Sequence, residues 1–383
     1  MKVLLSAVAV VLVLLSQSAL ACTDIQLTAK DGAVLVGRTL EWEGVLKKAP
    51  DGTSYLASNL NYAVRAWPAG IKITSTKPDG TAGASWTTKY AYFGFADKGS
   101  PDLLLDGQNS AGLSVEALEF AEYANYQDVK PTDKDVIATD DIDSWLLGNF
   151  DSVDDIKREL PKMTVWGKPN LAIPLPLKQV PEVHLVVHDK SGKSIIIEYI
   201  RKKLHIYDNE LKVMTNSPDY TSMSNNSNKY VNLSQGDALR ASCDIKGQSD
   251  NRNRAGTIGL PGDYSSPSRF VKAAYLVFFG KQPDTAKEGV RSVIHILNNV
   301  DIPLGAVREK MSDGNCSMDY TQWKVIKDLK NGIWYIDTFQ NIGSIVKIDL
   351  NEVFANPGRY LKPVGLTDIS YPDVPKINDL LKN

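Results

Sequence analysis

Apolar and polar side chains alternate along several stretches of the chain, and this period of two predicts β-strands. The first such stretch covers residues 22–27, in which Ile25 and Leu27 share one face. Lys30-Asp31-Gly32 predicts a turn, and residues 33–42 predict a second strand that runs back beside the first. The pattern therefore predicts an antiparallel hairpin with Cys22 at one end.

Further along the chain, strands and helices are predicted in separate blocks. Because these blocks lack the strand–helix–strand rhythm of parallel sheets, we expect an α+β fold with antiparallel sheets, in one domain over residues 22–383. Residues 221–258 are polar, and we expect them to be irregular apart from a short helix near 236–242. The predicted strands cover 90–95, two strands within 103–120, 184–188, 194–200, 203–207, 211–215, 321–329, 333–339 and 344–350, and the predicted helices cover 140–160, 266–279 and 284–299.

The first 21 residues have the pattern of a secretory signal peptide. Met1-Lys2 is a short positive start, residues 3–15 are almost entirely apolar, and Ala19 and Ala21 are the small residues that a signal peptidase requires. The apolar run is too short for a comfortable membrane span. We therefore expect export to the periplasm or outside the cell, with a mature N-terminus at Cys22.

Composition narrows the function further. The 383 residues are 43% hydrophobic and 23% charged, with a net charge of −2, which is ordinary for a globular protein. This balance argues against a nucleic-acid-binding protein. Because no second long apolar run follows the signal, we expect no stable membrane insertion after the cut.

A chain that begins with Cys22 would carry a thiol and a free α-amine on one residue. A thiol is a strong nucleophile, and an α-amine titrates near pH ~8, so it can act as a base at neutral pH. The chain has three cysteines. A disulfide between Cys243 and Cys316 in an oxidising compartment would leave Cys22 free, and this pairing is a hypothesis.

Three further motifs carry side chains suited to amide chemistry. Arg38 lies in Gly37-Arg38-Thr39-Leu40-Glu41-Trp42, where the hairpin would bring its guanidinium near Cys22 and favour the thiolate. Asn216 ends a predicted strand, and its amide could donate to an oxyanion. Arg269 follows Pro261-Gly262-Asp263-Tyr264-Ser265-Ser266-Pro267-Ser268, at the start of a predicted helix.

These pieces, in this order, resemble the choloylglycine hydrolase family of N-terminal nucleophile hydrolases, which contains bile salt hydrolases and penicillin V acylases. The resemblance implies a four-layer αββα sandwich that hydrolyses a non-peptide amide in a small molecule, with no metal or cofactor, and a homotetramer. It implies that Cys22 is the nucleophile with its own α-amine as the base. It further implies roles for Arg38 beside the thiol, Asn216 in the oxyanion hole and Arg269 in the charge network of the site.

Two positions depart from the family pattern. Glu41 stands where an Asp usually holds the α-amine, and Glu119 stands where bile salt hydrolases have an oxyanion-hole Asn. An ionised carboxylate cannot donate a hydrogen bond, so the second oxyanion donor must come from elsewhere. This difference favours activity like that of the penicillin V acylases of the Gram-negative exported branch, including cleavage of N-acyl homoserine lactones, over bile salt hydrolysis. Trp42 and Trp86 are candidate walls of the acyl pocket.

Two other functional interpretations of the sequence stay open. Lipid attached to Cys22 would make the chain an anchored binding protein, although Ala19 and Leu20 are nearly the reverse of what lipidation prefers. His184 and His188 share a strand face and would suit a Cys-His protease, but no protease motif surrounds Cys22.

Overall fold

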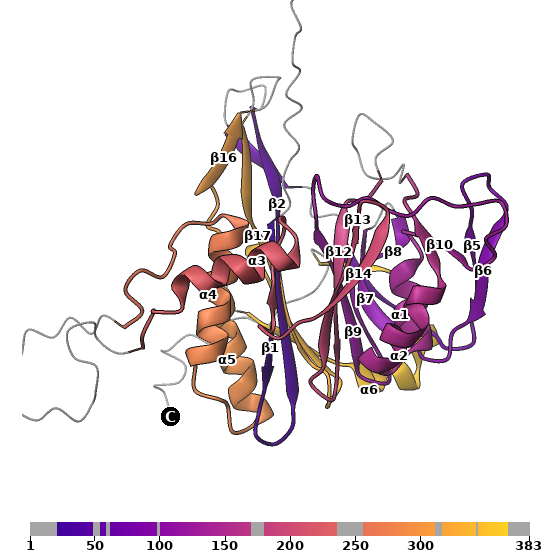
Figure 1. Cartoon of the computed structure of the whole chain (residues 1–383). Helices are drawn as coiled ribbons and strands as arrows, with labels where there is room; N and C mark the ends of the chain where they lie inside the picture. The colour runs from indigo at the N-terminus through magenta and orange to yellow at the C-terminus, as the bar shows by residue number, and fades with distance from the viewer. Residues whose placement is uncertain are drawn as a thin grey trace, which may run out of the picture.

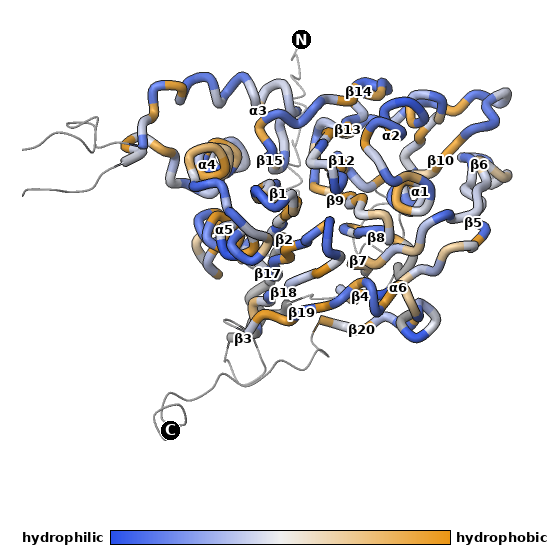
Figure 2. Tube along the Cα trace, turned by 90° about the horizontal axis from the view of Figure 1, so that it is seen from below, coloured by the Kyte–Doolittle hydropathy of each residue, from blue (hydrophilic) through white to orange (hydrophobic). Residues whose placement is uncertain are grey.

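A computed structural model describes residues 21–48, 54–58, 62–97, 100–169, 180–235, 256–310, 316–341 and 344–366. Four layers follow one another across the molecule: helices, a sheet, a second sheet and helices again (Figure 1). The view from below shows the same order, with α4 and α5 outside one sheet and α1 and α2 outside the other (Figure 2). The α+β prediction with antiparallel sheets and the αββα sandwich are therefore confirmed.

The first sheet contains the predicted hairpin. β1 (Ala21–Thr28) pairs antiparallel with β2 (Val34–Lys48), and the chain turns between them at Gly32, which has a left-handed φ of 80°. Within the described residues the order is β15 (Val213–Met214), β1, β2, β17 (Cys316–Asp328), β18 (Ile333–Thr338) and β19 (Val346–Asp349), with β16 (Val307–Lys310) on β17 and β3 (Ser54–Ser58) on β2.

The second sheet faces the first and is also antiparallel. Its order within the described residues is β14 (Lys203–Asp208), β13 (Ser194–Ile200), β12 (Val183–Asp189), β9 (Leu113–Glu119), β8 (Ser100–Asn109), β7 (Tyr92–Asp97), β4 (Tyr62–Trp67) and β20 (Val364–Gly365). Two smaller pairs lie beyond it: the hairpin of β5 (Lys72–Thr76) and β6 (Ala82–Thr87), and the parallel pair of β10 (Val136–Ala138) and β11 (Thr164–Trp166).

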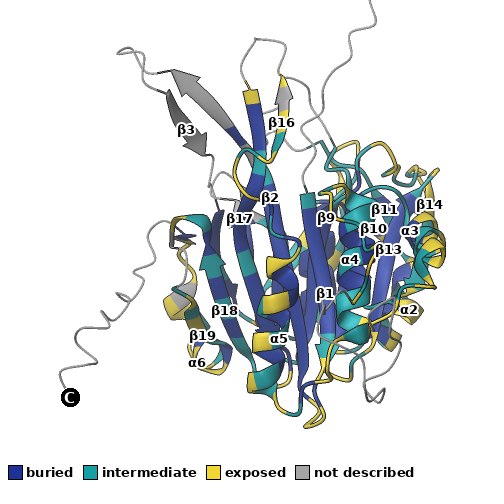
Figure 3. Ribbon diagram, turned by 90° about the vertical axis from the view of Figure 1, so that its left-hand side faces the viewer, coloured by how far each residue is buried: buried dark blue, intermediate teal, exposed yellow. Residues whose placement is uncertain are grey.

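The helices cover the outer faces of the sheets. α4 (Ser266–Phe279) and α5 (Ala286–Asn298) pack on the first sheet, and α1 (Ile142–Asn149) and α2 (Val153–Glu159) pack on the second. The outward side of α5 is exposed while the strands beneath it are buried (Figure 3). Shorter helices are α3 (Tyr220–Ser227) and α6 (Leu350–Ala355), and single 3-10 turns are η1 (Leu160–Lys162), η2 (Asn228–Tyr230), η3 (Phe339–Asn341) and η4 (Pro357–Tyr360). In the described part of the chain, no helix is long and apolar enough to cross a membrane.

Most element predictions hold, and the exceptions have local causes. The helix predicted over 140–160 is divided in two because Ser152 caps α2 by accepting from the Asp155 N–H, after Phe150 has left the helical conformation. The stretch after residue 220, expected to be irregular, begins with α3, which Asp219 caps in the same way. The short helix expected near 236–242 lies outside the described residues, and so does Cys243 of the hypothetical disulfide.

The two faces of β1 meet different layers. Ile25 and Leu27 pack in the core beneath the helices, as the alternation predicts. Gly37, directly opposite Ile25 on β2, lets α5 approach closely, because a Cβ there would lie 2.3 Å from Val293 Cγ1. The polar side chains of Asp24 and Gln26 face the second sheet, where both bond to His188 of β12.

Gly37→Ala is expected to lower the free energy of unfolding by about 1–3 kcal/mol, because the added methyl overpacks the contact between β2 and α5. Gly262→Ala is the matched control, since a Cβ there meets nothing within 4 Å, and it should change stability by less than about 0.5 kcal/mol. Denaturant unfolding of the two variants measures the difference. Equal stability of both would contradict the close packing.

Candidate functional site

Cys22 lies in a central strand of the first sheet, with its side chain directed toward the second sheet. The register of the hairpin places Cys22 opposite Leu40 and Asp24 opposite Arg38. Side chains on directly opposed positions share a face, so the Cys22 thiol and the Arg38 guanidinium meet between the sheets. Arg38 Nη2 lies 3.6 Å from Cys22 Sγ, and both residues are about 1% exposed. The expected proximity of Arg38 to Cys22 is therefore present.

Arg38 is held rigidly from the second sheet. Its Nη1 donates to the Leu105 carbonyl of β8, and its Nη2 donates to the Ala117 carbonyl of β9 at 2.6 Å. The guanidinium also lies over the ring of Trp323, 5.4 Å from its centroid. Burial would lower the pKa of Arg38, but the charges of Cys22 and Asp106 outweigh it and raise that pKa. Arg38 is thus a fixed cation beside the thiol.

The thiol itself is buried in a setting of opposing charges. Burial raises the pKa of Cys22, Arg38 works against this rise, and the negative charge of Glu41 adds to it. The net direction is upward, so the thiol holds its proton until a base removes it. A nucleophilic Cys22 therefore requires a proton acceptor close to its sulfur.

The nitrogen of Cys22 is held from the side of β15. It donates to Asn216 Oδ1 at 2.7 Å, and in this chain it is the peptide nitrogen joined to Ala21. Asn216 Oδ1 also accepts from Arg269 Nη2 at 2.8 Å, while Asn216 Nδ2 donates to the Glu119 carbonyl at 3.2 Å. A cut before Cys22 would make this nitrogen an α-amine next to its own thiol.

Arg269 ties the start of α4 to β1. Its Nη1 donates to the Cys22 carbonyl at 2.6 Å and to Thr23 Oγ1 at 2.7 Å, and its Nε donates to the Tyr264 carbonyl. Ser266 completes the connection by accepting from the Asn216 N–H. The two distant motifs around Asn216 and Arg269 therefore converge on the backbone of Cys22.

Glu41 lies on the helix side of the hairpin. Its Oε1 accepts from Thr321 Oγ1 at 2.8 Å, and its Oε2 has no hydrogen-bond partner among the described residues. Burial raises the pKa of Glu41 to about 7, against the opposing charge of Arg269. In this chain the Cys22 N–H bonds to Asn216, and Glu41 acts on Cys22 through its charge. The role of Glu41 in holding a free α-amine at Cys22 stays a prediction.

The two candidate tryptophans lie in different places. Trp42 follows Glu41 on β2 and packs, partly buried, against the core cluster that contains Cys22. Trp86 belongs to β6, beyond the second sheet, and packs against the core cluster beneath α1 and α2 (Figure 1). The prediction that Trp86 lines the site is wrong, because its strand pairs only in the outlying β5–β6 hairpin.

The two strand histidines have other partners. His184 bonds to the Thr215 carbonyl at 2.8 Å and to Glu198 at 3.2 Å. His188 Nδ1 bonds to Gln26 Oε1 and its Nε2 to Asp24 Oδ1, both at 2.8 Å. These bonds occupy all four ring nitrogens, so the geometry gives no support to a Cys-His pair.

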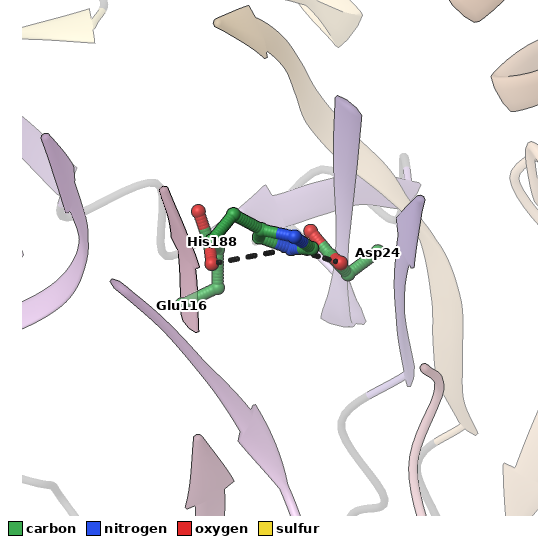
Figure 4. Close-up of side chains that lie close together, drawn as sticks. All are labelled: Asp24, Glu116 and His188. Carbon is green, nitrogen blue, oxygen red and sulfur yellow. Dashed lines mark hydrogen bonds and ion pairs between the residues drawn. The ribbon is translucent and has the colours of Figure 1, made fainter. Parts of the chain in front are cut away.

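A buried group of charges surrounds His188. Its ring lies between Asp24 and Glu116, and donor atoms of the three residues lie within 4.8 Å of one another (Figure 4). Such donors could hold a cation, but Lys327 already places its ammonium on Glu116 and 2.7 Å from Asp106 Oδ1. Because Gln26 Nε2 donates to the Gly192 carbonyl, Gln26 Oε1 faces His188 and accepts its Nδ1 proton. The other ring nitrogen, Nε2, lies 2.8 Å from Asp24 Oδ1.

Sequence reasoning missed the residues that support the site. Thr23 bonds to Arg269, Thr321 bonds to Glu41, and Ser266 bonds to Asn216. Behind Arg38 lie Asp106 and Lys327. One signal was available: polar residues recur on alternate positions of strands whose other positions are apolar. Here that pattern marks the layer between two sheets, although alternation alone does not distinguish such a layer from a solvated face.

A model of the family described as linear amide C–N hydrolases, choloylglycine hydrolase family, matches residues 22–356. The bile salt hydrolase/transferase of Clostridium perfringens is 29% identical over 340 residues, covering 86% of this chain and 93% of that protein. The penicillin V acylase of Pectobacterium atrosepticum is 26% identical over 294 residues, covering 70% and 68%. The crystal structure of a mutant conjugated bile acid hydrolase from Clostridium perfringens superposes with a TM-score of 0.67 at 28% identity, covering 86% and 93%.

The buried charges also predict how stability depends on pH. Burial raises the pKa of Asp143, in α1, to about 8. Its neutral form is favoured in the folded state, so its contribution is full at acid pH and is lost as the pH rises from about 4 through 8. The free energy of unfolding of Asp143→Asn minus that of wild type should therefore rise by about 2–5 kcal/mol between pH 4 and pH 9, at 1.36 kcal/mol per pKa unit. Urea unfolding at both pH values tests this, and parallel profiles would contradict it.

Proposed function

Because the chain belongs to the choloylglycine hydrolase family of linear amide C–N hydrolases, we propose that it is an exported amidase with Cys22 as its N-terminal nucleophile. The thiol attacks the amide carbonyl, and the Cys22 α-amine is the base. The chain hydrolyses small acyl amides rather than peptides.

One observation carries this proposal: the sulfur and the nitrogen of Cys22 are each held by a separate set of side chains. Arg38 lies 3.6 Å from the sulfur, while Asn216 accepts from the nitrogen at 2.7 Å and is itself held by Arg269. The first contact favours a thiolate. The second aims the nitrogen, so that as a free amine it can take the thiol proton.

The chemistry needs only a few proton movements. The α-amine takes the proton from Cys22 Sγ, and the sulfur forms a bond to the carbonyl carbon of the substrate. The resulting oxyanion collapses, the carbon–nitrogen bond breaks, and the ammonium returns the proton to the leaving amine. Water, deprotonated by the same amine, then attacks the thioester carbonyl, the carbon–sulfur bond breaks to release the carboxylic acid, and the ammonium returns its proton to Cys22 Sγ.

The burial of Cys22 favours cleavage of the bond between Ala21 and Cys22 before the chain folds. Ala21 and Cys22 are both paired with β2, opposite Glu41 and Leu40, and Cys22 is about 1% exposed. A protease must accommodate an extended, accessible segment, and the interior of a sheet offers none. Removal of residues 1–21 during export, before the chain folds, is consistent with this burial and with a family match that begins at Cys22.

Amides of an acyl group with a compact ring amine, such as penicillin V and N-acyl homoserine lactones, are the first candidate substrates. The argument is that position 119 holds a carboxylate, which cannot donate to an oxyanion when it is ionised, where bile salt hydrolases have an amide donor. Conjugated bile salts are the second candidate, and the match to the bile salt hydrolase/transferase of Clostridium perfringens favours them.

Cys22→Ser is expected to lower turnover by about 1000-fold, because a hydroxyl is a far weaker nucleophile than a thiol with the same base. Cys316→Ser is the matched control, since Cys316 is exposed on β17 and should leave turnover unchanged. The intact mass of the exported protein should correspond to residues 22–383. A lipid adduct on Cys22, or a retained leader, would instead indicate an anchored binding protein.

A substrate panel separates the two candidates. We expect kcat/KM for penicillin V and for a long-chain N-acyl homoserine lactone to exceed that for taurine- and glycine-conjugated bile salts by about tenfold or more. Release of the free amine, measured at equal substrate concentrations, gives the comparison. The opposite order would assign the chain to the bile salt hydrolases of its family.

A further inference from the structure

The carboxylate of Asp106 lies between the buried cations of Lys327 and Arg38 and is closer to Lys327. Its Oδ1 lies 2.7 Å from Lys327 Nζ, whereas its Oδ2 lies 3.4 Å from Arg38 Nη1. Charge-assisted contacts between arginine and carboxylate usually measure about 2.7–2.9 Å and often involve two parallel hydrogen bonds. Asp106 is therefore bonded to Lys327 and only loosely paired with Arg38, although all three side chains are buried.

The loose pairing leaves the guanidinium free for other contacts. Arg38 Nη2 donates to the Ala117 carbonyl and contacts Cys22 Sγ, whereas Asp106 is near Nη1. A bidentate pair with Asp106 would demand two parallel N–H donors and would rotate the planar group. Arg38 cannot satisfy that geometry and keep its present position beside the sulfur.

We propose that Lys327 is a positioning residue that holds Asp106 so that Arg38 stays on Cys22. Lys327 comes from β17, two strands from Cys22 in the sheet, and reaches Asp106 and Glu116 across the layer between the sheets. It lies over the ring of Trp334, 5.6 Å from its centroid, as Arg38 lies over Trp323. Without the ammonium, Arg38 would be the one cation that the described residues place in a salt bridge with the buried carboxylate of Asp106, which would draw Arg38 away from the thiol.

The balance of charges suggests a test with matched variants. In the layer between the sheets, Arg38 and Lys327 face Asp24, Asp106 and Glu116, and His188 lies between Asp24 and Glu116. Lys327→Met removes one positive charge and leaves an excess of negative charge. Adding either Asp106→Asn or Glu116→Gln removes one of the two carboxylates that Lys327 contacts, but only the first removes the carboxylate that competes for Arg38.

The experiment measures alkylation of Cys22 by iodoacetamide against pH in the mature protein, with the modified residue identified by mass spectrometry. Lys327→Met should lower the alkylation rate at pH 7 by about tenfold and move the pH profile upward, as expected when a thiolate loses its cation. Lys327→Met/Asp106→Asn should recover to within about threefold of wild type, whereas Lys327→Met/Glu116→Gln should stay low. For a cleaved amide, kcat should follow the same order with KM nearly constant.

Two results would overturn the proposal. Equal recovery of both double variants would mean that Lys327 only balances charge, and wild-type reactivity of the Lys327→Met/Glu116→Gln protein would mean that Asp106 does not attract Arg38. If Lys327→Met alone does not fold, the two double variants can still be compared with each other. The inference depends on the proposed role of the Cys22 thiol, yet alkylation needs no substrate, so a failure of the amidase proposal would appear separately as a reactive thiol without turnover.

Discussion

The burial of the Arg38 guanidinium between the two sheets is the constraint on which the arrangement of the site depends. A buried cation needs hydrogen-bond acceptors and a balancing charge. The Leu105 and Ala117 carbonyls accept from Nη1 and Nη2 of Arg38, and Asp106 supplies the negative charge, while Arg38 Nε has no hydrogen-bond partner among the described residues. These groups belong to the second sheet, so the relative position of the two sheets is fixed at the point where the sulfur lies. The chemistry of Cys22 is thus coupled to the packing of the whole sandwich.

Much of the fold and part of the site could be predicted from local patterns. The alternation over residues 22–27 and the turn at Gly32 set the register of the hairpin, and that register alone brings Arg38 beside Cys22. The limits of α4 were predicted because Pro267 and an unbroken helical period mark them. Resemblance to a family, rather than any periodicity, connected the segments around Asn216 and Arg269 to the same site.

The remaining features depend on contacts that no local pattern encodes. Lys327 reaches Glu116 across 211 positions of sequence, and its neighbours in β17 resemble those of any half-buried strand. Trp86 was misplaced because an aromatic residue in a strand is compatible with any apolar neighbourhood, and here that neighbourhood is the core beneath α1 and α2. The surroundings of the polar side of β1 could not be predicted for a related reason. Alternation tells which residues share a face, but it does not tell whether water or another sheet lies opposite.

The hairpin of β1 and β2 also separates the contacts made by two atoms of one residue. The Cys22 sulfur is contacted by Arg38, which the second sheet holds in place, while the Cys22 nitrogen is contacted by Asn216, which follows β15 and is held by Arg269 of α4. The charges are not separated in this way, because Glu41 and Arg269, on the helix side of the first sheet, also shift the pKa of the thiol. A sequence change at either position would therefore act on the nucleophile as well as on the groups around the nitrogen, so the two functions of this one amino acid cannot be tuned independently there.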